Sequence, residues 1–290
     1  MDTLRYYYAE ASTSSPSPLP NLVHAFFLPN QYSSSDSTQT PFAPLMLVSF
    51  LQNIIAWSAL YLPTILFIWI FRAQLARFKI NPEETPADLK LKELRRTVTS
   101  LTILAFWDTL VLAPHVTSTP LPEVVSPIRF LVYVFLFLWS DLHFYTIHRA
   151  LHHPIWYSKI HKVHHESINP NPLSGLSFHP IEGLIYFSAL LIVFLVPLSP
   201  IEYTAYKFGL VWAPLGGHIG YTTYDVTKNK LEPRKFEHYV HHIKFNNNFG
   251  AGLFPDGWVW DQFLGTIWPE DKPILRQGSS SSSSNNNKTK

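Results

Sequence analysis

The chain has 290 residues and a formal net charge of +2 at pH 7; 47% of its residues are hydrophobic and only 14% are charged. Soluble domains usually carry about 25% charged residues, so this composition favours a membrane protein. The small net charge gives no indication of a nucleic-acid partner. Because the chain has no cysteine, disulfides, cysteine-bound zinc and iron–sulfur clusters are excluded, and any metal must be held by histidine, carboxylates or water.

Both ends of the chain have a low-complexity composition. Residues 1–41 are polar and rich in serine and proline, without the apolar core of a cleavable signal, and 271–290 is a serine- and asparagine-rich tail. We expect both to be disordered, because neither can bury enough apolar surface to fold. Between them we expect an amino-terminal membrane region at 42–126 and a catalytic domain at 127–270.

Four apolar runs follow one another between the two tails. Pro44 to Phe71 and Pro127 to Ile147 are long enough to cross a bilayer as helices, and Val98 to Ala113 is near the lower limit. Ile181 to Pro214 is apolar but interrupted at residues 197–200, which predicts a hairpin of two short helices. The sequence therefore predicts an all-α integral membrane protein with four to five membrane-embedded helices.

The distribution of charge predicts the orientation of these helices. Residues 72–96 contain seven lysines and arginines, whereas 115–126 contain none. By the positive-inside rule, 72–96 faces the cytosol and 115–126 faces the opposite side. The span at 127–147 then returns the chain to the cytosol, and a hairpin at 181–214 keeps it there. We therefore expect a cytosolic, histidine-rich cap formed by the segments that follow these helices.

Histidines gather in three clusters within the second half of the chain. Twelve of the fourteen histidines lie between residues 143 and 242. In a helix, residues at i, i+3 and i+4 share one face, and imidazole is the commonest biological ligand for transition metals. The clusters HRALHH, HKVHH and HYVHH supply these candidate ligands: His148, His152, His153, His161, His164, His165, His238, His241 and His242.

The number of imidazoles predicts two metal ions, since no single ion takes more than about six such ligands. Imidazole suits zinc, copper, iron and nickel, so the residues alone do not name the metal. His179 and His218 are further candidates, each either a ligand or a residue that supports one. His153 lies off the face shared by His148 and His152, so it joins the site only if the helix unwinds before Pro154.

Asp141 is the remaining candidate site residue. It lies on the same helical stripe as Tyr145, His148 and His152, and a carboxylate within an apolar span needs a partner. We expect it to hydrogen-bond a ligating histidine, as carboxylates commonly do in metal sites. The alternative is that Asp141 only caps the interfacial end of the span.

The three clusters, in this order around an apolar hairpin, resemble the fatty acid hydroxylase/sterol desaturase superfamily of membrane di-iron enzymes. DLHFYTIHR before the first cluster, HPIEG after the second, and the carboxyl-terminal NNNFG and WDQFLGT carry the same resemblance. It covers about residues 127–268 and is closest to the sterol C-5 desaturase-like branch. The loop at 221–236 and the FPDGW segment at 254–258 depart from that branch.

The resemblance implies two iron ions, O2 as cosubstrate and oxidation of an unactivated C–H position of a lipid, with a sterol in the endoplasmic reticulum membrane as the expected substrate. Its metal ligands would be the histidines of the three clusters, with His152 or His153 as alternatives and His218 as an addition. The chain has no His-Pro-Gly-Gly haem loop, so electrons would come from cytochrome b5 or a similar carrier, for which the 72–96 loop is a possible docking surface.

Three other functions remain open at this stage. The substrate could be a fatty acyl lipid or a terpenoid that is hydroxylated rather than desaturated. The chain could also be a non-catalytic, metal-binding partner of lipid enzymes. A zinc-dependent hydrolase would need a carboxylate base, for which Glu166 beside His165 is the close candidate.

Overall fold

The computed structural model describes residues 42–111, 127–228, 236–250 and 259–269. Within these ranges the chain is helical and has no strand, although one isolated β-bridge joins Lys79 to Tyr221. The prediction of an all-helical fold is therefore confirmed for this part of the chain. The predicted tails, the loop at 115–126 and the FPDGW segment lie outside the described residues.

Three long helices contain the first three apolar runs. They are α3 (Phe42–Ile70), α5 (Ala87–Val111) and α6 (Pro127–Leu151). Of the described helices, α3 and α6 are long and apolar enough to cross a membrane. Helix α5 begins eleven residues before its predicted apolar run, because its charged first half is also made of good helix formers and follows Pro86. Four to five membrane-embedded helices remain a prediction.

The fourth apolar run forms a hairpin with the predicted break. Its first arm is α8 (Pro180–Phe187) continued by the 3₁₀ helix η7 (Ser188–Phe194), and its second arm is α9 (Pro200–His218). Helix α9 begins with a capping box, in which Ser199 and Glu202 satisfy each other's backbone N–H groups. The second arm carries His218 at its last residue, so the hairpin delivers a candidate ligand to one end of the fold.

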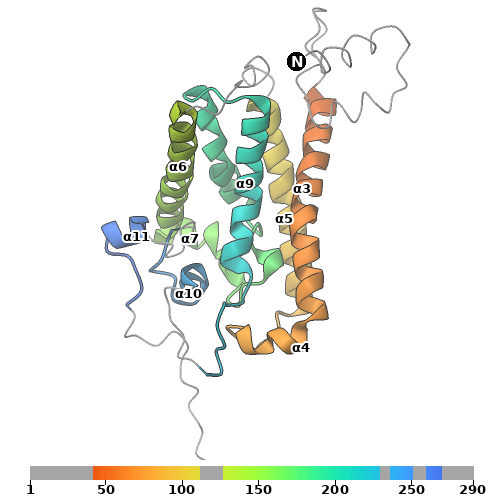
Figure 1. Cartoon of the computed structure of the whole chain (residues 1–290), viewed down its shortest axis with the longest axis vertical. Coiled ribbons are helices and arrows are strands. Elements are labelled where there is room, and N and C mark those ends of the chain that lie inside the picture. The colour runs from red at the N-terminus through yellow and green to blue at the C-terminus, as the bar shows by residue number, and fades with distance from the viewer. Residues whose placement is uncertain (1–41, 112–126, 229–235, 251–258, 270–290) are drawn as a thin grey trace, which may run out of the picture.

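In Figure 1 helix α9 lies between α6 and α3. Near the lower end of these long helices in this view lie the short helices α4 (Arg72–Leu75), α7 (Pro154–Tyr157) and α10 (Glu237–Lys244). Helix α5 packs against α3 and α8, and α3 also packs against α9. The apolar interior is formed by fully buried side chains such as Leu101, Phe187 and Leu190.

The basic 72–96 segment lies at the same end of the bundle as the histidine clusters. Backbone hydrogen bonds join Ile80 N to Gly220 O at 3.1 Å and Thr222 N to Phe78 O at 2.9 Å, just after His218. Arg96 donates to the carbonyl of Val163 within the second cluster at 3.2 Å. The predicted common side is therefore supported by these contacts, whereas its assignment to the cytosol remains a prediction.

A buried ionic network connects α3, α5 and α9 inside the bundle. Lys207 Nζ lies 2.9 Å from Asp108 Oδ2, and both side chains are at most 2% exposed. The other carboxylate oxygen of Asp108 accepts from Tyr203 at 2.7 Å, and Ser49 and Asn53 of α3 also donate to Asp108. Since buried charges are costly unless paired, this network fixes how α9 packs against the two amino-terminal helices.

Replacement of Lys207 by methionine should lower the free energy of unfolding by about 3–5 kcal/mol, because it leaves Asp108 buried without its counter-charge. Unfolding of the detergent-solubilised protein by denaturant would measure this. The double variant Asp108→Asn/Lys207→Met should recover much of the loss, and Lys92→Met, which breaks the exposed pair with Asp88, should cost less than about 1 kcal/mol. Equal effects of Lys207→Met and Lys92→Met would contradict this role of the network.

Candidate metal centre

Four elements bring the histidines together beneath the helical bundle. His148 lies on the last turn of α6 and His152 directly follows that helix. The second cluster forms the 3₁₀ helix η5 (His161–Glu166), the third cluster lies on α10, and α9 ends at His218. All of these rings are buried except that of His152, which is partly exposed.

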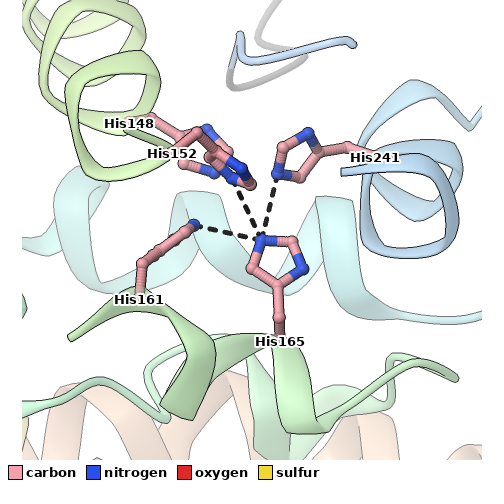
Figure 2. A group of neighbouring side chains, drawn as sticks. All are labelled: His148, His152, His161, His165 and His241. Carbon is pink, nitrogen blue, oxygen red and sulfur yellow. Dashed lines mark hydrogen bonds between the residues drawn. The ribbon is translucent and has the colours of Figure 1, made fainter. Parts of the chain in front are cut away.

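Five of these histidines form one group, which we call the five-histidine group (Figure 2): His148, His152, His161, His165 and His241. One ring nitrogen of each lies within 4.8 Å of those of the others. The Nε2 atom of His165 lies at the centre, 3.2 Å from His152 Nε2 and 3.1 Å from His161 Nε2. His241 Nε2 approaches it from α10 at 3.2 Å.

The other four form a second set, the four-histidine group: His164, His218, His238 and His242. His218 Nε2 lies 3.2 Å from His164 Nε2 and 3.1 Å from His242 Nε2. His242 Nε2 lies 3.3 Å from His238 Nε2. The two groups are neighbours, since the ring centroids of His165 and His242 are 4.6 Å apart. This arrangement provides two adjacent sites rather than one large site.

Each HxxHH cluster divides its histidines between the two groups. In η5, His161 and His165 belong to the five-histidine group and His164 to the other. In α10, His238 and His242 belong to the four-histidine group and His241 to the other. The pair at i and i+4 therefore remains together in each cluster, while the i+3 residue joins the neighbouring group. Both clusters thereby hold the two sites at a fixed separation.

Hydrogen bonds from the outer ring nitrogens orient four of the rings. His148 Nδ1 donates to the carbonyl of Phe249 at 2.7 Å, and His241 Nδ1 to that of Asn247 at 2.6 Å. His218 Nδ1 donates to Pro214 O at 2.7 Å, and His161 Nδ1 lies 2.8 Å from Glu182 Oε1. A neutral imidazole has one ring proton, which is on Nδ1 in each of these bonds. The lone pair of Nε2 is therefore free to point into the histidine group to which the ring belongs.

Burial also keeps the histidine rings of both groups neutral. Desolvation lowers the pKa of His152 to about 2 and lowers the pKa of His161 and His241 well below the usual range. It has the same effect on the pKa of His164 and His242. Because metals bind unprotonated imidazole, the environment holds these rings in the form that a ligand needs.

The geometry fits metal ions. Zn²⁺ binds imidazole at about 2.0–2.1 Å, so two ligand nitrogens at 90–109° lie about 2.8–3.4 Å apart, which includes the 3.1–3.3 Å found here. The Nε2 atom of His165 can donate its one proton to only one of its three neighbours. In the absence of a cation, the lone pairs of the other nitrogens would therefore face each other. His148 Nε2 is also buried without a hydrogen-bond partner. A cation in each group satisfies all these nitrogens.

Nine of the ten predicted histidine positions lie in the two groups, including His218. His153 is exposed and lies outside both, because the chain turns there into α7 (Pro154–Tyr157) instead of extending the face of α6. His179 also lies outside both groups and caps α8, where its Nδ1 accepts from Ile181 N at 3.2 Å. Asp141 is buried on α6, and its predicted bond to a histidine remains a prediction.

Glu182 was not predicted as a site residue, although it hydrogen-bonds His161. It lies on α8, is 4% exposed and also lines the cavity above the histidines. The sequence contained a usable signal, since Glu182 opens an apolar helix in which an unpaired carboxylate would be costly. The same physical argument applies to Asp141, which is buried on α6.

The carboxyl-terminal NNNFG and WDQFLGT segments fold together and support His148. Asp261 on α11 (Val259–Phe263) accepts from Phe249 N at 2.8 Å and Gly250 N at 2.6 Å. This fixes the Phe249 carbonyl that receives the His148 proton. Asn248, at φ 56°, donates to Glu237 O at 3.2 Å, which connects the same loop to α10. These motifs therefore act by positioning the ligands.

Close packing at Gly217 sets the distance between α9 and α10. A Cβ atom at this position would lie 3.0 Å from the His238 ring. Any larger residue would therefore displace a member of the four-histidine group. The glycine thus allows His218 and His238 to belong to the same site.

The fold and the site define a helical protein with two apolar candidate spans and a paired, all-histidine metal centre. Residues 133–266 match the model of the family described as fatty acid hydroxylase. The match confirms the predicted resemblance to the fatty acid hydroxylase/sterol desaturase superfamily.

Curated relatives agree with the predicted branch. Delta(7)-sterol 5(6)-desaturase of Leptosphaeria maculans is 35% identical over 149 residues, 49% of this chain and 39% of the relative. The Delta(7)-sterol 5(6)-desaturase of Eremothecium gossypii is 34% identical over 146 residues, again 49% of this chain and 39% of the relative. A Dictyostelium discoideum protein named provisionally as a methylsterol monooxygenase is 46% identical over 66 residues, 23% of this chain and 24% of the relative. Each of these names describes an oxidoreductase.

The chain aligns with about two fifths of the length of the two desaturases. No solved structure matches the chain.

Replacement of His241 or of His238 by alanine should each lower the metal content from about two ions per chain to about one, because each removes a ligand from a different group. Elemental analysis of the purified variants measures this. His153→Ala is the matched control and should keep both ions, since that ring is exposed outside the groups. A loss of metal from His153→Ala as large as that from His241→Ala would contradict the grouping.

Removal of the Glu182 carboxylate in Glu182→Leu should weaken metal binding at the five-histidine group about 10- to 100-fold, because His161 loses the acceptor that fixes its tautomer. Competition with a chelator of known affinity measures the change. Glu166→Leu is the control, since Glu166 pairs with Arg96 at 2.9 Å and lies outside both groups. Equal metal affinities of the two variants would exclude this role for Glu182.

Proposed function

We propose that this chain is a membrane oxidoreductase that uses two iron ions, O2 and external electrons to desaturate or hydroxylate an unactivated C–H position of a lipid, with a sterol as the substrate class. The observation that carries the proposal is the pair of adjacent all-imidazole groups beside an apolar cavity. The family match and the names of the relatives support the same chemistry.

The chemistry of the donors favours redox catalysis over hydrolysis. All nine members of the two groups are histidines, so no carboxylate among them is left to act as a general base. Glu166, the candidate base of a hydrolase, pairs with Arg96 instead. Two irons held in these groups would supply O2 activation. The role of the protein residues is to hold neutral rings in place and to orient the substrate beside them.

A cavity beside the histidines is the proposed place for the reacting part of the lipid. We call it the metal-side chamber; its non-atom space of about 640 Å³ includes space open to the outside. Histidines of both groups line it, including His148, His161 and His218, and its upper wall is formed by apolar residues such as Phe178 and Leu210. Such a lining excludes water from the reacting position and leaves hydrocarbon as the favoured occupant.

The overall reaction balances with one O2, two electrons and two protons. Desaturation removes two hydrogens from adjacent carbons and forms an alkene with two waters. Hydroxylation inserts one oxygen atom into a C–H bond and forms an alcohol with one water. The two outcomes differ in whether the carbon that has lost a hydrogen receives an oxygen atom or the adjacent carbon loses a second hydrogen.

Location and electron supply follow from the same proposal. The apolar helices α3 and α6 would place the chain in the endoplasmic reticulum membrane, with the histidine groups facing the cytosol. The basic 72–96 segment lies at the same end as the groups and would attract an acidic carrier such as cytochrome b5. Its alternative role is to set the orientation of the helices in the membrane.

Purified protein reconstituted with cytochrome b5 and its reductase should contain two irons per chain and should consume O2 while oxidising a Δ7-sterol. Product analysis against a panel of sterols, fatty acyl lipids and terpenoids would identify the substrate class. His164→Ala and His241→Ala should each lower turnover at least 100-fold, whereas His153→Ala should retain it. Two bound metals without turnover on any lipid would favour the non-catalytic alternative, and retained turnover in His164→Ala would exclude the binuclear site.

A further inference from the structure

A second apolar cavity lies on the outer side of the helical bundle, between α6 and α9. We call it the outer groove. It contains about 1040 Å³ of non-atom space, part of which is open to the outside. Leu136, Phe137 and Tyr206 form much of its wall, and Ile201, at its edge, is 62% exposed. Helix α6 is one of the candidate spans, so the groove would open towards lipid.

The outer groove adjoins the metal-side chamber, since Ser140 and Leu210 line both cavities. At their boundary Ser140 Oγ lies 3.1 Å from Tyr206 OH, and these two side chains also bond the carbonyls of Leu136 and Ala189. Rotation of these side chains would join the two cavities. The two cavities can thus hold different parts of one elongated molecule.

Small residues on α9 make the outer groove open. Ala205 and Gly209, one helical turn apart, both line it. A Cβ atom built at Gly209 meets no atom within 4 Å, so the glycine faces empty space and is not needed for helix packing. A larger side chain at residue 209 would therefore enter the groove without a clash with the protein.

The length of the combined cavities suits a long lipid. Tyr133, at the far end of the outer groove, lies fifteen residues before His148 on α6, an axial distance of about 22 Å. The polar group at that far end is Glu202, which already pairs with Arg129 and accepts from Tyr133 at 2.6 Å and Ser199 at 2.7 Å. It has little capacity left to bind a lipid hydroxyl.

We propose that the outer groove binds the hydrocarbon side chain of a sterol whose hydroxyl-bearing ring lies in the metal-side chamber. This rests on the proposed function. In a sterol, C5 is two carbons from the hydroxyl-bearing C3, so oxidation at 5(6) requires the polar end to lie beside the metals. The opposite, apolar end must then extend away from them, and the outer groove is the cavity that adjoins the chamber.

Two sterols test this orientation: 5α-cholest-7-en-3β-ol and 5α-androst-7-en-3β-ol. They share the rings, the hydroxyl and the double bond, but the second lacks the side chain. In nanodiscs, Gly209→Phe should weaken binding of the first at least tenfold and change binding of the second less than twofold. Gly209→Ala adds only one methyl group to the groove, so it should change the binding of either sterol much less.

Gly216→Phe is the matched control, because Gly216 is an exposed α9 glycine that also faces open space and lines neither cavity. It should bind both sterols as the wild type does. Equal weakening of both sterols in Gly209→Phe, or unchanged binding of the long one, would overturn the proposal. So would failure of the wild type to bind either sterol. Binding of this pattern without any O2-dependent product would preserve the groove assignment but reject the proposed function.

Discussion

The structure depends on the convergence of nine neutral imidazoles in a space from which water is excluded. Unpaired ring nitrogens are costly when buried, so each ring needs a fixed orientation and a partner for its inward lone pair. The outer nitrogens of His148, His161, His218 and His241 donate to oxygens supplied by three different segments. The inward nitrogens then have the spacing that metal ions require. The remaining architecture serves to bring these segments to one place.

The helical bundle performs this task through a few specific contacts. The Asp108–Lys207 pair fixes α9 against the amino-terminal helices, and α9 carries His218 at its last residue. Glu93 on α5 is buried and accepts from Ser167 and Asn171, which holds the segment that follows the second cluster. The amino-terminal helices lie largely outside the family match, yet they position ligands within it. The predicted boundary at residue 127 therefore separates segments that are in contact in the fold.

Much of the site could be predicted from sequence because its information is local. Ligand spacing within one turn of helix identifies the clusters, and long apolar runs identify α3 and α6. The division of each HxxHH cluster between two groups could not be predicted, because an ideal helix places all three residues on one face. That division depends on where η5 and α10 lie relative to α6 and α9, which is a tertiary property. The position of Glu182 in an apolar helix indicates that it needs a partner, whereas the identity of that partner, His161, 21 residues away, depends on the tertiary fold. His153 was expected to join the site only if the helix unwound before Pro154; the chain does turn there, but the turn into α7 leaves His153 exposed outside both groups.

The central claim is that two iron ions occupy adjacent groups made of histidine. X-ray absorption spectroscopy at the iron K-edge tests it most directly, because it reports the identity of the ligands and the distance to a second metal. The account predicts a coordination shell with strong imidazole scattering, no sulfur, and an iron–iron vector of about 3.5–4 Å or slightly longer. A single isolated iron without a metal neighbour, or a protein that retains only zinc after growth in iron-rich medium, would contradict it.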